Sequence, residues 1–191
     1  MTIGIVVEGQ TDVNVYSTLI HRIRPDVNRV IPKPCGGASG VRQQMVGWLK
    51  NFQWHAGHNV EKALIIRDSD CRDPEAVEDE LAHTLSQSRF QATFPVHFYA
   101  TKCELEAWLL ADANAVNAVA QRRQKAPAAK SVAGVLERIR DAKERFLGML
   151  SQARLPADPA VYLEVAATVN LERVQERCPY FQQFVERVHA C

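Results

Sequence analysis

The stretch IGIVVEGQTDV, residues 3–13, decides how this chain folds. Ile3–Val7 is short, apolar and mostly β-branched, which is typical of a strand buried on both faces of a parallel sheet. Gly9 ends the run, Thr11 is a suitable N-cap, and apolar side chains then recur at helical spacing as far as Ile23. The stretch therefore predicts a buried strand that leads directly into an amphipathic helix.

The same alternation continues through the first hundred residues. Further short apolar runs lie at 30–31, 63–66 and 94–99, and amphipathic segments separate them. Strands that alternate with helices are joined by right-handed crossovers and form a parallel sheet. We therefore expect an α/β, Rossmann-like fold with a mostly parallel sheet of about four strands flanked by helices.

The second half of the chain has a helical pattern almost throughout. One long amphipathic helix is expected over 132–150, and shorter ones over about 159–177 and 179–190. The chain is accordingly divided into an α/β core at residues 1–112 and a C-terminal helical extension at residues 113–191, packed on the core.

Composition places the chain among ordinary globular proteins. The hydrophobic fraction of 47% is enough to form a real core. The sequence contains no run of 18 or more apolar residues, so no membrane span is expected. The first eight residues are interrupted by charge too early for a secretory signal, so a cytoplasmic location is expected. The five cysteines are odd in number and scattered without a C-x-x-C pair, which favours reduced thiols over a disulfide frame or a zinc site.

Charge is distributed unevenly although the net charge is only +1. Residues 113–154 hold nine basic and three acidic side chains, so this segment carries +6. A basic segment of this kind suits a polyanion such as nucleic acid. The alternative is a solvated helix surface that binds nothing.

Acidic side chains follow two of the expected strands. Glu8 comes directly after the first strand, and Asp68 and Asp70 come after the third. Parallel α/β sheets bind ligands beyond the carboxyl ends of their strands. Mg²⁺ prefers oxygen ligands, and crowded carboxylates need a cation to offset their mutual repulsion. The pattern predicts a site for Mg²⁺ or Mn²⁺, although each residue alone could be a turn or cap residue.

Two of these stretches resemble the TOPRIM domain of topoisomerases, bacterial primases and small or defence-associated nucleases. They are VVEGQTD at 6–12 and IIRDSD at 65–70. Two more, CELEAWLLAD at 103–112 and CPYF at 178–181, are similar to an uncharacterised TOPRIM-like family of single-domain bacterial proteins. Some members of that family are encoded beside ATPases and defence genes.

The resemblance implies roles for the acidic residues. Glu8 would do general acid–base work at a phosphodiester, and Asp68 and Asp70 would hold Mg²⁺. Glu106 would supply a second-metal ligand or hold a first ligand in place, because the E-A-W-L-L run begins there. Residues two apart on a helix point in different directions, so only Glu106 or its alternative Glu104 is expected to face the site. Asp12 is a further alternative ligand or support for one.

A glycine-rich turn at 36–40 precedes an expected helix. Helix N-termini bind phosphate through free N–H groups, so this turn is a candidate for a nucleic-acid phosphate, while a plain tight turn is the alternative. The candidate phosphate-binding residues are Lys33, Gly36, Gly37, Ser39, Arg42 and Lys102.

The function expected from these features is Mg²⁺-dependent hydrolysis of DNA or RNA phosphodiester bonds, in anti-phage or mobile-element defence. The alternative is a non-catalytic or partner-dependent regulatory subunit of an ATPase-containing defence complex. A phosphotransfer or nucleotide-binding domain of the flavodoxin-like kind also uses carboxylates at strand ends, but it leaves the E-A-W-L-L-A-D run unexplained.

Overall fold

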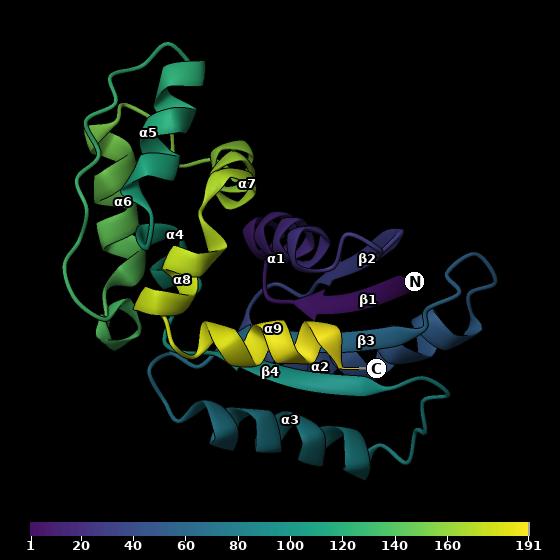
Figure 1. Ribbon diagram of the computed structural model, residues 1–191. Coiled ribbons are helices and arrows are strands. Elements are labelled where there is room, and N and C mark those ends of the chain that lie inside the picture. The colour runs from purple at the N-terminus through teal and green to yellow at the C-terminus, as the bar shows by residue number, and fades with distance from the viewer. Residues whose placement is uncertain (191) are drawn as a thin grey trace.

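The computed structural model describes residues 1–190; Cys191, expected to be a free thiol, lies outside them. A single sheet of four parallel strands forms the centre of the molecule (Figure 1). Its strands are β1 (Thr2–Val7), β2 (Arg29–Pro34), β3 (Lys62–Asp68) and β4 (Val96–Thr101), in the order β2-β1-β3-β4. The predicted α/β fold with a parallel four-stranded sheet is confirmed.

Three helices connect the strands and cover both faces of the sheet. They are α1 (Gln10–Ile23), α2 (Ala38–Trp54) and α3 (Pro74–Gln87). α1 packs in the larger hydrophobic cluster on one face, and α2 and α3 pack in a second cluster on the other. Gly4 in β1 lets α2 approach closely, because a Cβ there would lie 2.6 Å from the Phe52 ring.

Most of the remaining helices form the extension that packs on the α1 side of the sheet. α7 (Pro159–Thr168) lies along α1 and α9 (Phe181–His189) lies beside β4, while α5 (Ala113–Arg122) and α6 (Ala142–Gln152) stand side by side at one end of the molecule (Figure 1). No helix within residues 1–190 is long and apolar enough to cross a membrane. The other two helices are α4 (Glu106–Leu110), which ends the α/β core, and α8 (Leu171–Arg177), which belongs to the extension.

The long helix predicted over 132–150 is wrong in its first half. Gly134 has φ +86°, which a right-handed helix does not admit, and only a short 3-10 turn at Leu136–Arg138 precedes α6. The Arg177 guanidinium of α8 donates to the carbonyl oxygen of Val132 and, at 2.9 Å, to that of Ala111. Contacts with α8, which is distant in the sequence, therefore keep this segment non-helical although its apolar residues have helical spacing.

Two cysteines also depart from the expectation of reduced thiols. Cys71 and Cys103 form a disulfide. β3 and β4 are neighbouring parallel strands in which Asp68 pairs with Thr101, so the turns that follow them lie side by side. The 32-residue separation hides this neighbourhood from sequence spacing. Two thiols, Cys35 and Cys178, are free and buried within the part of the chain that the structure describes.

Candidate functional site

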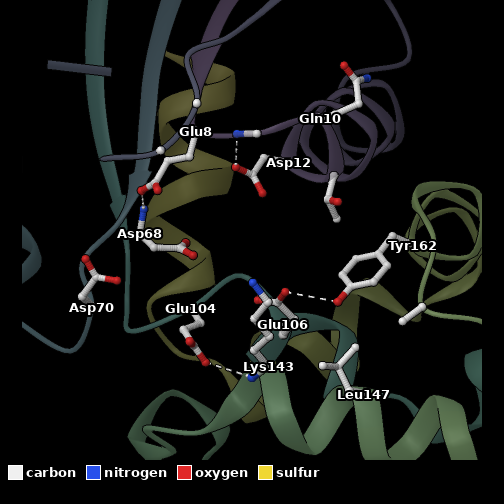
Figure 2. A pocket seen from close by; sticks show the side chains of 15 residues that line it. Glu8, Gln10, Asp12, Asp68, Asp70, Glu104, Glu106, Lys143, Leu147 and Tyr162 are labelled. Carbon is white, nitrogen blue, oxygen red and sulfur yellow. Dashed lines mark hydrogen bonds between the residues drawn. The ribbon is translucent and has the colours of Figure 1, made fainter. Parts of the chain in front are cut away.

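A pocket of about 660 Å³ opens at the carboxyl ends of β1 and β3 (Figure 2). The strand order reverses between these two strands, because β2 lies on one side of β1 and β3 lies on the other. Such a switch point is where open α/β sheets bind their ligands. Six carboxylates line this pocket: Glu8, Asp12, Asp68, Asp70, Glu104 and Glu106.

Glu8 is tied into the sheet rather than free to move. Its Oε1 accepts a hydrogen bond from the backbone N–H of Asp68 at 3.0 Å, which joins the end of β1 to the end of β3. Burial raises the pKa of Glu8, the hydrogen bond from Asp68 opposes this, and the charges of Asp12 and Asp70 raise it further. Glu8 is therefore a carboxyl group that takes up a proton more readily than an exposed glutamate does.

Asp12 combines a structural role with a place in the pocket. The N-cap of α1 is Gly9 rather than the expected Thr11, and Asp12 Oδ2 accepts the N–H of Gly9 at 2.8 Å. Its carboxylate lies on the pocket side of α1, facing Asp68 and Glu106 (Figure 2). Burial raises the pKa of Asp12, while the bond from Gly9 and the charge of Lys143 lower it.

The two aspartates of the D-x-D pattern lie differently. β3 ends at Asp68, whose side chain points into the pocket (Figure 2). Asp70 has φ +51°, is exposed, and pairs with Arg67 at 3.7 Å. Residues two apart point to the same side only in an extended segment. The chain has already turned before Asp70, so Asp68 and Asp70 do not share one side.

The pKa of Asp68 is strongly affected by its surroundings in the pocket. Burial raises its pKa well above the usual range, and the charges of Asp12, Glu106 and Glu8 raise it further. A hydrogen bond from the backbone of Leu105 only partly offsets this. Asp68 therefore lies in a buried position where the negative charges of three neighbouring carboxylates accumulate.

Glu104 and Glu106 both line the pocket, although only one was expected to face it. α4 begins at Glu106, so Glu104 lies in the turn before the helix and the helical spacing argument does not apply. Glu104 Oε2 accepts the backbone N–H of Lys143 at 2.9 Å, in the first turn of α6. Glu106 is only 7% exposed and its Oε1 accepts the hydroxyl of Tyr162 at 3.3 Å. Burial raises the pKa of Glu106.

The sequence prediction missed the two polar residues that the helical extension contributes to the pocket. Lys143 of α6 is the one cationic residue that lines the pocket within residues 1–190, and Tyr162 of α7 is buried against Glu106. The charge of Lys143 lowers the pKa of Asp12 and of Glu106. The net positive charge of residues 113–154 was the available signal for Lys143; Tyr162 has no local signal, because tertiary packing alone brings α7 to the site.

The glycine turn lines the pocket, but the N–H groups of its first two glycines already donate hydrogen bonds within the protein. Gly36 and Gly37 donate their N–H groups to the carbonyl oxygen of Glu8 at 2.8 and 2.9 Å. Gly40 is required for the compact turn, because a Cβ there would lie 1.9 Å from the carbonyl oxygen of Cys35. The turn thus fixes the backbone of Glu8, and the N–H groups of Gly36 and Gly37 are not available to bind a phosphate.

The other candidate phosphate ligands do not gather at the pocket. The Lys33 ammonium lies 4.7 Å from the centre of the Trp48 ring, and that of Lys102 lies 6.0 Å from the Tyr180 ring. Outside the pocket lining lie Lys33, Lys102 and two further candidates, Ser39 and the exposed Arg42.

The donor set suits a hard divalent cation in kind and in charge. Its side-chain donors are carboxylate oxygens, the ligands that Mg²⁺ and Mn²⁺ prefer, and burial together with the negative charge of neighbouring carboxylates raises the pKa of Asp68. Within residues 1–190, however, no three His, Cys, Asp or Glu side chains are already arranged to hold a metal ion. Binding would therefore have to draw these carboxylates together.

Comparison with known proteins bears on the family rather than on the reaction. No curated protein sequence and no solved structure matches the chain. A family model, DUF4276, described as a domain of unknown function, matches residues 7–189. The match begins at the last residue of β1 and spans β2, β3 and β4, the acidic pocket and the helical extension together. The chain belongs to the DUF4276 family.

Proposed function

We propose that this protein is a Mg²⁺- or Mn²⁺-dependent nuclease that hydrolyses phosphodiester bonds of DNA or RNA. The observation that carries the proposal is the pocket at the switch point of the sheet, which six carboxylates and one lysine line together. Such a set matches what a phosphodiester reaction needs: oxygen ligands for a divalent cation, a proton-transfer group and a counter-charge for phosphate.

The proposed division of roles follows the geometry. Asp68 is the central ligand, with Asp12 and Glu106 opposite it and Asp70 at the rim. Glu8 is the proton-transfer group, because its raised pKa suits general acid–base work and the N–H of Asp68 fixes its direction. A divalent cation bound there supplies charge neutralisation at the phosphate and a water molecule of lowered pKa.

Lys143 is the proposed contact for the substrate phosphate. It projects from α6 toward the carboxylates, and no carboxylate in residues 1–190 lies within 4.0 Å of its ammonium group. A nucleic-acid backbone can approach along the basic segment 113–154 that contains it. The resemblance to TOPRIM nucleases supports this substrate class, and a role in defence against foreign genetic elements is part of the same proposal.

The test is cleavage of plasmid DNA, single-stranded DNA and single-stranded RNA by the purified full chain with Mg²⁺ or Mn²⁺. Glu8→Gln and Asp68→Asn should each lower the cleavage rate by about 100-fold or more, since one removes the proton-transfer group and the other the central ligand. Asp70→Asn is the matched control and should cost less than about tenfold, because Asp70 is exposed and turned away. Equal losses in all three variants would contradict the assignment.

A partner-dependent role is the second candidate. It is favoured by the observation that no three acidic side chains converge as a ready metal site anywhere in residues 1–190. A regulatory subunit of an ATPase-containing complex would be inactive alone with every substrate and either metal. Cleavage that appears only after addition of the ATPase would support this candidate over the first.

A further inference from the structure

Glu106 is held from outside the α/β core. It lies in the first turn of α4 with 7% of its surface exposed, and its Oε1 accepts the hydroxyl of Tyr162 at 3.3 Å (Figure 2). The two residues are 56 positions apart, and Tyr162 belongs to α7 in the helical extension. The extension therefore contacts a carboxylate of the pocket directly.

Tyr162 is itself rigidly placed. Its side chain is buried, and its ring meets the Phe146 ring of α6 edge to face at a centroid distance of 5.0 Å. Asp158 caps α7 by accepting the N–H of Val161 at 2.8 Å, and Pro159 occupies the start of the helix. The neighbouring helix α1 packs along α7, so the hydroxyl cannot easily leave its position.

A phenol hydroxyl donates a single hydrogen bond, so it restrains one oxygen of Glu106 and leaves the rest of the carboxylate for the pocket. Groups that hold a ligating carboxylate in this way decide its orientation, and their removal weakens metal binding without removing a ligand.

We propose that Tyr162 is the positioning residue of Glu106, and that the helical extension is thereby part of the cation site rather than only its cover. Tyr162 acts through Glu106 and does not touch the cation. The inference rests on the proposed metal-dependent function, and it adds a residue from the extension to the site.

The test is a calorimetric titration with Mn²⁺ of four full-length proteins: wild type, Tyr162→Phe, Glu106→Gln and the double variant. Tyr162→Phe keeps the buried ring and removes only the hydroxyl, and it should weaken Mn²⁺ binding by about tenfold. Because Tyr162 acts through Glu106, the double variant should bind Mn²⁺ as weakly as Glu106→Gln alone and no more weakly.

Tyr99→Phe is the matched control. It removes another buried hydroxyl, which donates to the carbonyl oxygen of Tyr180 at 3.2 Å and lies outside the pocket lining. Its melting temperature should fall about as far as that of Tyr162→Phe, while its Mn²⁺ affinity should equal that of the wild type. A loss of affinity in both variants would mean that a general loss of stability, and not positioning, explains the effect.

The outcomes separate the two proposals. A wild type that takes up no Mn²⁺ overturns the proposed function and this inference with it. A wild type that binds Mn²⁺, beside a Tyr162→Phe variant that binds equally well, overturns the positioning role alone. Losses that simply add in the double variant also overturn it, because Tyr162 would then act independently of Glu106.

Discussion

The α/β half and the helical half of this protein contribute different chemistry to one pocket. The half that ends with α4 supplies the six carboxylates, from the ends of β1 and β3, the first turn of α1 and the segment after β4. The helical half supplies Lys143 and Tyr162, together with apolar lining from Leu147 and Ala157. The difference teaches that the acidic set follows from the topology of the sheet, whereas its counter-charge and support depend on how the extension packs.

The largest expected effect lies in the first half, at the disulfide. Cys71 and Cys103 join the turn that carries Asp70 to the turn that carries Glu104, across 32 residues of chain. Closing a loop of that length lowers the conformational entropy of the unfolded chain and so raises its free energy by about 3 to 4 kcal/mol. Cys71→Ser should therefore lower the free energy of unfolding by about that amount in guanidinium titrations.

Reduction provides the control for this prediction. A dithiol reductant should destabilise the wild type toward the value of Cys71→Ser, and it should leave a Cys71→Ser/Cys103→Ser double variant unchanged. If the wild type unfolds at the same guanidinium concentration with and without the reductant, the bridge does not stabilise this half of the molecule.

An intermediate effect is expected from the second half, at Lys143. Lys143→Gln should lower kcat/KM for nucleic-acid cleavage by about tenfold, which corresponds to about 1.4 kcal/mol, mainly through a higher KM. Mn²⁺ affinity should not fall, because the lysine charge opposes the cation and contributes no ligand. Lys125→Gln, an exposed change on the same basic segment outside the pocket, is the control. Equal changes in KM for both variants would show that Lys143 acts only as surface charge.

The smallest expected effect is a dependence of stability on pH. Burial and the neighbouring carboxylates raise the pKa of Asp68 in the folded state, so above about pH 4 the unfolded chain ionises this group while the folded chain retains the proton until the pH reaches the raised pKa. Without metal, the stability of the wild type should therefore fall relative to Asp68→Asn as pH rises through this range. Melting curves of both proteins by circular dichroism measure the difference, and parallel pH profiles would contradict the raised pKa.

The sequence predicted the first half of the molecule well because its signals are local. Ile3–Val7 is apolar and β-branched, and the strand found there is buried on both faces as the parallel-sheet pattern requires. Glu8 and Asp68 could be assigned to one edge of the sheet from the α/β alternation alone. Asp70 could not be placed, because the positive φ that turns it away depends on where β3 ends.

The second half resisted prediction for the opposite reason. The segment before α6 has helical periodicity, yet Gly134 and hydrogen bonds from Arg177 keep it irregular. Tyr162 has the pattern of an ordinary apolar helix residue, and only the packing of α7 brings its hydroxyl to Glu106. The disulfide likewise depends on the pairing of β3 with β4, which spacing between cysteines does not reveal.

The most direct test of the cation site is a crystal structure of the full chain soaked in Mn²⁺, with anomalous scattering used to locate the metal. The account predicts an anomalous peak in the pocket between β1 and β3, coordinated by Asp68 and by Asp12, Glu106 or both. A map without a peak in this pocket, or a peak elsewhere with Asp68 left uncoordinated, would contradict it.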